Sequence, residues 1–168
     1  EFRGTMPRVV PCGGRSQTYE SFMDAMEDHP GESILLLVDS EGPVADISRP
    51  CAHLARRQAD QWDLRSVEED QVHLMVQAME TWLIADRNAL QEYYGQGFRE
   101  SALPRTDNLE KVPKDKLEPR LQKAAAGTSK RGYSKLRDGP SLLELADARE
   151  VRRHCASCLR LFRVLSAK

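Results

Sequence analysis

Apolar residues occur as short continuous runs and in helical spacing, and the two patterns alternate along the first part of the chain. Residues 8–12 and 33–38 are short apolar runs of the kind found in parallel strands covered on both faces. Between them, an apolar residue recurs every three or four positions from about residue 16 to 28, which predicts a helix. Strand, helix and strand with short joints predict a βαβ unit.

The same patterns continue further along the chain. Residues 72–77 form another apolar run, and it leads almost directly into a helical pattern that closes near residue 94. After a polar stretch, helical spacing returns over residues 117–126 and 141–165, with a break near Asp147. The elements predict an α/β fold with a parallel sheet flanked by helices and a helical C-terminal portion.

We therefore expect an α/β domain over residues 1–103 and a basic helical portion over residues 104–168 that packs on it. No apolar run approaches the roughly 20 residues that a membrane span needs. The chain has no signal peptide pattern and too few cysteines for a disulfide framework. These observations favour a cytoplasmic protein without membrane association.

Two cysteines near the C-terminus have a spacing found in zinc and redox sites. Cys155 and Cys158 could join Cys51 and His53 in a zinc site. However, Cys155 and Cys158 also lie on the apolar face of the predicted C-terminal helix. Burial in the core is the favoured interpretation.

Charge is unevenly distributed, although the net charge is −1. Residues 16–48 carry acidic side chains and no Lys or Arg, whereas bases outnumber acids over residues 105–137. The division is compatible with a metal site that faces a phosphate-binding surface. It is also typical of solvated helix faces, and for charge runs taken alone this is the favoured interpretation.

Acidic residues follow the predicted strands. Asp39 and Glu41 come directly after the apolar run 33–38, and Glu80 lies at the junction between the run 72–77 and the next helix. Ligands of parallel sheets bind beyond the carboxyl ends of the strands, and carboxylates are the ligands that Mg²⁺ and Mn²⁺ prefer. Alternatively, Asp39 caps the next segment and Glu80 favours a helix dipole. Together, the three acids predict a site for Mg²⁺ or Mn²⁺.

Basic residues provide candidate phosphate contacts. Arg15 follows a glycine turn that can present backbone N–H groups to a phosphate, although the turn has neither a Rossmann nor a Walker pattern. Lys130, Arg131 and Lys135 lie in a basic loop, and Lys114 precedes a helix. We expect contacts of these side chains to phosphate groups or nucleic acid.

Three segments carry a resemblance to a known family. Residues 9–15, 37–43 and 70–82 resemble an uncharacterised bacterial family of Toprim-like proteins that is known only as a domain of unknown function. Residues 94–98 and 112–114 are also similar to that family.

The resemblance implies a site and a reaction. Toprim domains use a glutamate after the first strand and an Asp-x-Asp after a later strand to hold Mg²⁺ for phosphodiester chemistry. By resemblance, Asp39 and Glu41 match the Asp-x-Asp, Glu80 is similar to the further acid of OLD-type nucleases, and Lys114 to their basic residue. The implied function is a metal-dependent nuclease or phosphoryl-transfer enzyme beside an ABC-type ATPase in bacterial defence.

One feature departs from the Toprim pattern. The first strand and its glutamate do not occur before Arg8. The chain also opens with Glu1 in place of Met, which indicates a cloning remnant, a processed end or a missing first strand. The alternative is a non-catalytic subunit that binds nucleic acid or an ATPase. A third hypothesis is a structural domain with a vestigial acidic pocket.

Overall fold

Two of the predicted apolar runs form a small parallel sheet. The computed structural model describes residues 7–167, in which β1 (Leu36–Asp39) pairs with β2 (Val72–Met75) in parallel. Leu36 lies opposite Val72, and Asp39 lies opposite Met75. Both strands therefore end at the same edge of the sheet, as the sequence predicts.

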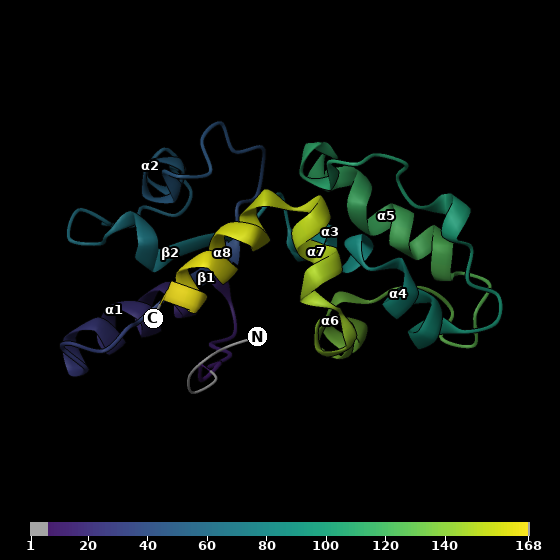
Figure 1. The fold of residues 1–168 in the computed structure, drawn as a ribbon, viewed down its shortest axis with the longest axis horizontal. Coiled ribbons are helices and arrows are strands. Elements are labelled where there is room, and N and C mark those ends of the chain that lie inside the picture. The colour runs from purple at the N-terminus through teal and green to yellow at the C-terminus, as the bar shows by residue number, and fades with distance from the viewer. Residues whose placement is uncertain (1–6, 168) are drawn as a thin grey trace.

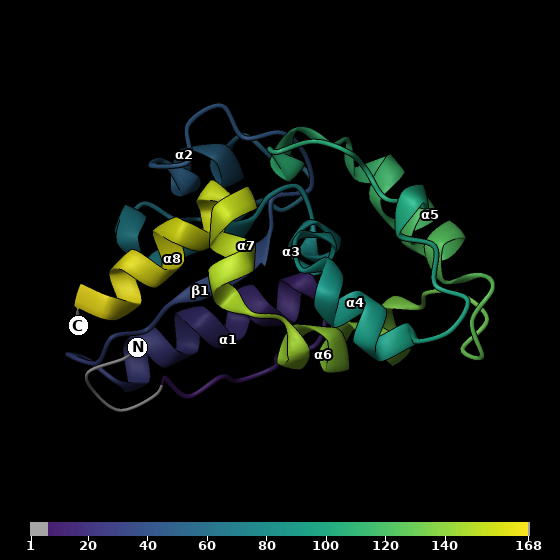
Figure 2. The same ribbon diagram turned by 45° about the vertical axis from the view of Figure 1, so that its right-hand side comes forward.

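Apolar side chains cover both faces of the sheet. Leu36 and Val38 alternate to one face and join Phe22 of α1 (Arg15–Asp28) and Leu54 of α2 (Pro50–Ala55) in a buried cluster. The helix α8 (Ala156–Ala167) packs against β2 on the other face. In Figures 1 and 2, β1 consequently lies between α1 and α8.

A group of helices lies beside the sheet, on the right in Figure 1. The helix α3 (Met79–Ala85) is central to it and contacts the four other helices of the group. A second buried cluster, which includes Leu83, Leu90, Leu117 and Leu142, holds the group together. Its other helices are α4 (Arg87–Tyr94), α5 (Lys114–Ala125), α6 (Lys135–Leu145) and α7 (Ala148–His154), and short 3₁₀ helices span Glu69–Gln71, Glu100–Ala102 and Leu109–Lys111.

The expected α/β class with a helical C-terminal part is confirmed, but the strand expected over residues 8–12 is wrong. The segment has no regular secondary structure, and Val9 and Val10 are 84% and 59% exposed. Pro11 lacks a backbone donor, and within the described residues no neighbouring strand pairs with the segment. The predicted βαβ unit that began there is therefore absent from residues 7–167, and the crossover from β1 to β2 carries α2 instead.

Two long helical patterns are divided in the structure. Asp86 ends α3 and caps α4, because its Oδ1 accepts a hydrogen bond from the Ala89 N–H at 3.0 Å. The predicted break near Asp147 is confirmed, and a second break at Cys155 separates α7 from α8. The domain division at residue 103 stays a prediction, since the second cluster contains residues on both sides of it.

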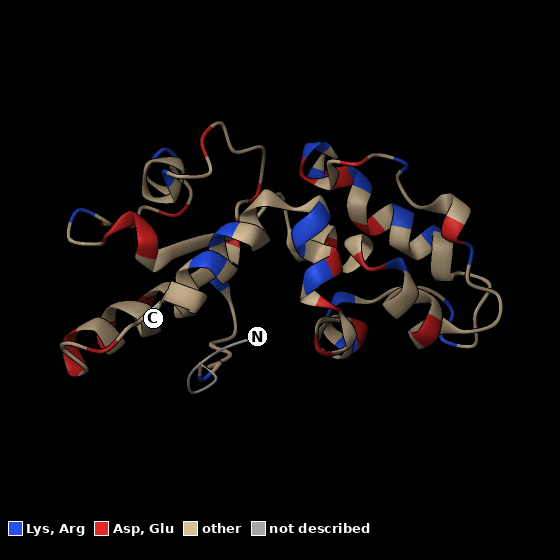
Figure 3. Ribbon diagram, in the orientation of Figure 1, with Lys and Arg blue, Asp and Glu red and all other residues tan. Residues whose placement is uncertain are grey.

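The cysteines follow the simpler interpretation, whereas the interpretation of the charge distribution stays a prediction. Cys155 and Cys158 are each 1% exposed and belong to the second cluster, so their predicted burial is confirmed. Figure 3 shows acidic and basic segments interspersed over α5, α6 and α7, with acidic residues at the far end of α1. In the described part of the chain, no helix is long and apolar enough to cross a membrane.

Candidate functional site

Asp39 and Glu80, two of the predicted acids, meet at the carboxyl edge of the sheet and share one ammonium group. Asp39 ends β1, and Glu80 lies in the first turn of α3, shortly after β2. Lys135, the first residue of α6, places its Nζ 3.0 Å from Asp39 Oδ2 and 3.5 Å from Glu80 Oε2. We call these three side chains the acid–lysine cluster.

The carboxylates of the acid–lysine cluster are buried and held by further donors. Their side chains are 14% exposed at Asp39 and 5% at Glu80. Asp39 Oδ1 accepts a hydrogen bond from the Met79 N–H at 2.7 Å, and Glu80 Oε1 accepts one from the Tyr133 hydroxyl at 3.0 Å. Because every carboxylate oxygen has a partner, both side chains are fixed in orientation.

Burial and charge act in opposite directions on the cluster. Burial raises the pKa of Asp39 above its ordinary value, and the neighbouring Glu80 adds to this, although Lys135 opposes it. Burial lowers the pKa of Lys135, but the charges of Asp39 and Glu80 outweigh burial and raise it overall. Burial and Glu80 also raise the pKa of Tyr133, which keeps the phenol protonated as a donor.

Glu41 lies outside this cluster and forms an ion pair with Lys114 instead. The sequence placed Glu41 in one predicted metal site with Asp39, but the φ of Glu41 is 65°, in the left-handed region, so the chain does not stay extended there. The Glu41 N–H donates to the Gln77 carbonyl at 2.9 Å, and the Lys114 N–H donates to Gln77 Oε1 at 3.1 Å. Gln77 therefore holds both partners of this second ion pair.

The chemistry of the donors fits a site with two protein carboxylates. Within residues 7–167, no group of three or more His, Cys, Asp or Glu side chains is arranged to hold a metal ion. Mg²⁺ commonly takes one or two carboxylates and completes its shell with water and substrate phosphate. Asp39 and Glu80 match that donor set once the Lys135 ammonium moves aside, whereas Glu41 is engaged elsewhere.

Arg15 supports the end of β1. Its Nη1 donates to the Asp39 carbonyl at 2.6 Å, and its Nε and Nη2 donate to both oxygens of Asp60 at 2.9 and 2.8 Å. The guanidinium also lies over the Trp62 ring, 4.6 Å from its centroid. The predicted phosphate contact of Arg15 would therefore compete with these bonds.

The basic loop contributes one of its predicted residues to the cluster. Lys135 joins Asp39 and Glu80, whereas Lys130 lies over the Tyr93 ring at 4.0 Å and Arg131 is exposed in the left-handed region. The structure thus brings Lys135 to the acids and leaves Lys130 and Arg131 outside the acid–lysine cluster.

A buried carboxylate fixes the start of α6. Asp138 accepts hydrogen bonds from the Ser134 N–H, from Arg137 and from the hydroxyls of Tyr93 and Tyr94. Burial would raise the pKa of Asp138, but these donors outweigh it and lower the pKa to about 2. Because Ser134 directly precedes Lys135, Asp138 helps to position the lysine of the acid–lysine cluster.

Sequence reasoning missed Tyr133 and Gln77. Tyr133 was visible as the aromatic residue of the basic loop, but its contact with Glu80 spans 53 residues. Gln77 follows β2, so its place at the strand end was a usable signal. Neither residue type is diagnostic without the fold.

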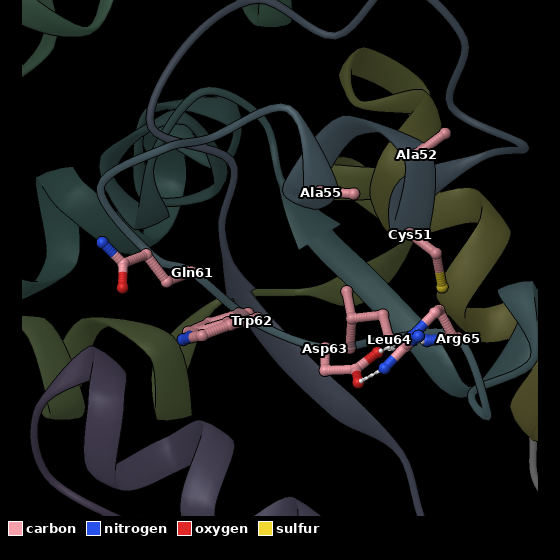
Figure 4. Close-up of a pocket in the computed structure, with 8 residues that line it drawn as sticks. All are labelled: Cys51, Ala52, Ala55, Gln61, Trp62, Asp63, Leu64 and Arg65. Carbon is pink, nitrogen blue, oxygen red and sulfur yellow. Dashed lines mark hydrogen bonds and ion pairs between the residues drawn. The ribbon is translucent and has the colours of Figure 1, made fainter.

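A hollow of about 480 Å³ lies next to α2, and Cys51, Trp62, Leu64 and Arg65 are among its lining residues (Figure 4). Figure 4 shows Asp63 and Arg65 paired with each other. Burial, followed by the charge of Glu69, raises the pKa of Cys51 to about 12, so this thiol is not a nucleophile at neutral pH.

Comparison with known proteins identifies a family for the chain. No curated protein and no solved structure matches it. Residues 7–166 match a family described as a domain of unknown function, DUF4276, which confirms that part of the resemblance seen in the sequence. The chain belongs to the DUF4276 family.

Proposed function

We propose that the acid–lysine cluster is the metal site of a Toprim-like enzyme that cleaves phosphodiester bonds in nucleic acid. The observation that carries the proposal is the sharing of Lys135 by two largely buried carboxylates at the carboxyl edge of a parallel sheet. Two such carboxylates repel each other and need a cation close by. A divalent ion, Mg²⁺ or Mn²⁺, supplies that charge at least as well as an ammonium group.

The side chains around the two acids have distinct roles in this proposal. When bound, the metal would polarise a phosphodiester and supply an activated water. The Met79 N–H orients Asp39, and the Tyr133 hydroxyl orients Glu80. Lys135, displaced from between the acids, and Lys114 would stabilise the negative charge that develops on the phosphate oxygens.

The resemblance in the sequence supports the finer parts of the proposal. The strand-end acids resemble those of Toprim-like bacterial proteins, which implies a nuclease that works beside an ABC-type ATPase in defence. Toprim domains place a further glutamate after their first strand, and residues 7–35 contain no strand that could carry one. The proposed metal site therefore depends on Asp39 and Glu80.

Cleavage of labelled DNA and RNA in the presence of Mn²⁺ tests the proposal. We expect metal-dependent cleavage that is lost in Asp39→Asn and in Glu80→Gln. Glu32, whose side chain is 70% exposed beside His29, provides the control variant Glu32→Gln, and this variant should retain cleavage. Cleavage that survives both cluster variants, or a wild-type chain that cleaves nothing, would contradict the proposed function.

A second candidate function is non-catalytic binding of nucleic acid or of an ATPase. One observation favours it, because Lys135 and Lys114 already neutralise the three predicted acids within the protein. This candidate predicts nucleic-acid binding that weakens steeply with salt and needs no divalent metal. Metal-independent binding together with absent cleavage would support it.

A further inference from the structure

A hollow of about 400 Å³ on the crossover from β1 to β2 is lined by basic side chains. Arg49 directly precedes α2, and Arg56 and Arg57 directly follow it, so the arginines line the hollow from both ends of this helix. His53 contributes a further nitrogen-bearing side chain, and Asp46 contributes a carboxylate. We call this hollow the arginine pocket.

The arginine pocket has positive charge without a matching partner. Arg49 and Arg56 are exposed, and neither guanidinium group forms a hydrogen bond or a close ion pair with another described residue. Asp46 is the acidic residue among those that line the pocket, but its Oδ1 already accepts hydrogen bonds from the Ser48 N–H and hydroxyl at 2.9 and 2.6 Å. Arg57 is paired with Asp60, so the side chains of Arg49 and Arg56 face one engaged carboxylate, and this excess of positive charge favours an anionic ligand.

Part of the pocket wall is rigid. Arg57 donates through Nε to Asp60 Oδ2 at 2.8 Å, and its two terminal nitrogens form no hydrogen bond with the described residues. Asp60 also binds Arg15, the residue that holds the Asp39 carbonyl. The arginine pocket is therefore tied to the end of β1 through a chain of hydrogen bonds.

A second bond ties the pocket to the same edge of the sheet. His53 Nε2 lies 2.9 Å from the carbonyl oxygen of Ser40, the residue that follows Asp39. Since a carbonyl accepts, His53 donates through Nε2 and is fixed in orientation. The pocket is thus bonded to the backbone of the residue that directly follows Asp39 of the acid–lysine cluster.

We propose that the arginine pocket binds a phosphoryl group. Guanidinium groups match the geometry of phosphate oxygens and remain charged at every physiological pH. One part of this inference rests on the proposed function, namely that the phosphoryl group belongs to a nucleic-acid backbone held next to the acid–lysine cluster. The phosphate binding itself stands on the residues of the pocket.

Binding without metal tests this inference. In EDTA, fluorescence anisotropy measures the affinity of a short labelled oligothymidine, and calorimetry measures that of pyrophosphate. The test variant is Arg49→Gln with Arg56→Gln, which spares Arg57 and its bond to Asp60. The control is Arg149→Gln with Arg153→Gln, which removes the same charge from the exposed side chains of α7.

We expect the pocket variant to bind the oligonucleotide at least about tenfold more weakly, because it loses two charged hydrogen-bond donors. The slope of its log affinity against log salt concentration should decrease in magnitude by about one to two. The control variant should change affinity by less than about twofold. Unchanged thermal unfolding in both variants excludes loss of fold as the cause.

Three outcomes would overturn the inference. They are a wild-type chain that binds neither probe, a pocket variant with wild-type affinity for both probes, and an equal loss in the pocket and control variants. Pyrophosphate binding that depends on the pocket, without oligonucleotide binding, would support a phosphoryl site and reject the nucleic-acid backbone as its source. Since metal is absent, these outcomes are independent of the cleavage assay.

Discussion

Lys135 Nζ lies 3.0 Å from Asp39 Oδ2, although 96 residues separate the two in the sequence. Asp39 ends the first strand, and Lys135 begins a helix of the C-terminal part. The contact therefore joins the sheet to the helical group at the site where chemistry is expected. It also means that the charge of the strand-end acid is balanced by a distant segment of the chain.

Lys135→Met should destabilise the protein at pH 8. The change leaves the buried Asp39 and Glu80 without their shared cation, at a cost of about 1 kcal/mol, since the partly exposed ammonium is screened by water. Because the pKa of Lys135 is raised in the fold, its contribution is fully present below its unfolded pKa and is lost only at higher pH. Urea unfolding with and without Mn²⁺ measures the effect.

Mn²⁺ should restore more stability to Lys135→Met than it adds to the wild type, since the ion takes the place of the ammonium group. Lys116→Met is the control, because Lys116 is 63% exposed and pairs with Asp115. Equal stability of both lysine variants, with no extra effect of Mn²⁺, would show that the acids do not need a cation.

Asp39→Asn should change how stability depends on pH. The folded state raises the pKa of Asp39, so it holds this proton more tightly than the unfolded chain. Asp39 therefore lowers stability as pH rises from about 3.9 to its folded pKa. Asparagine abolishes this loss while its side-chain oxygen still accepts from the Met79 N–H.

The stability of Asp39→Asn relative to wild type should thus increase over this pH window and then become constant. Urea unfolding of both proteins at a series of pH values measures the difference. A relative stability that decreases with pH over the same range would show that Lys135 outweighs burial at this carboxylate.

Asp138→Asn should destabilise the protein by roughly 2 kcal/mol at pH 7, because a buried carboxylate loses its charge-assisted bonds. The pKa of Asp138 is lowered to about 2, so its stabilisation is complete above the unfolded pKa and is lost as pH falls towards 2. Urea unfolding at pH 7 and under acidic conditions should show a difference that shrinks with acid. A difference independent of pH would contradict this explanation.

Gly97→Ala should destabilise the protein by roughly 2–4 kcal/mol, through backbone strain and overlap with a neighbouring chain segment. Gly97 has a φ of 89°, and a Cβ there would overlap with the carbonyl oxygen of Gly127. Thermal unfolding measures the loss. Gly42→Ala is the matched control, since nothing lies within 4 Å of its Cβ position; similar losses in both variants would contradict the close approach.

The sheet and its acids could be predicted from the sequence because they depend on local patterns. Continuous apolar runs identify β1 and β2, and parallel pairing places Asp39 and the start of α3 at one edge. The strand expected at residues 8–12 failed because an apolar run forms a strand only when another strand pairs with it.

The charge partners at the site could not be predicted because they depend on long-range packing. The contact of Lys135 with Asp39 requires α6 to pack against α3, which no spacing in the sequence specifies. The position of Glu41 was predicted wrongly because Glu41 itself has a left-handed backbone conformation. Glutamate rarely adopts this conformation, and sequence patterns do not indicate it. Lys135 was expected as a phosphate contact, but its contact with Asp39 was not, and Tyr133 was missed because its contact with Glu80 also depends on long-range packing.

Calorimetric titration with Mn²⁺ tests the central claim most directly. We expect the wild-type chain and Glu41→Gln to bind one Mn²⁺ ion, because Glu41 pairs with Lys114 away from the acid–lysine cluster. We expect Asp39→Asn and Glu80→Gln to lose this binding while they remain folded. Binding that persists in Asp39→Asn, or a wild-type chain that binds no Mn²⁺, would contradict a metal site at the acid–lysine cluster.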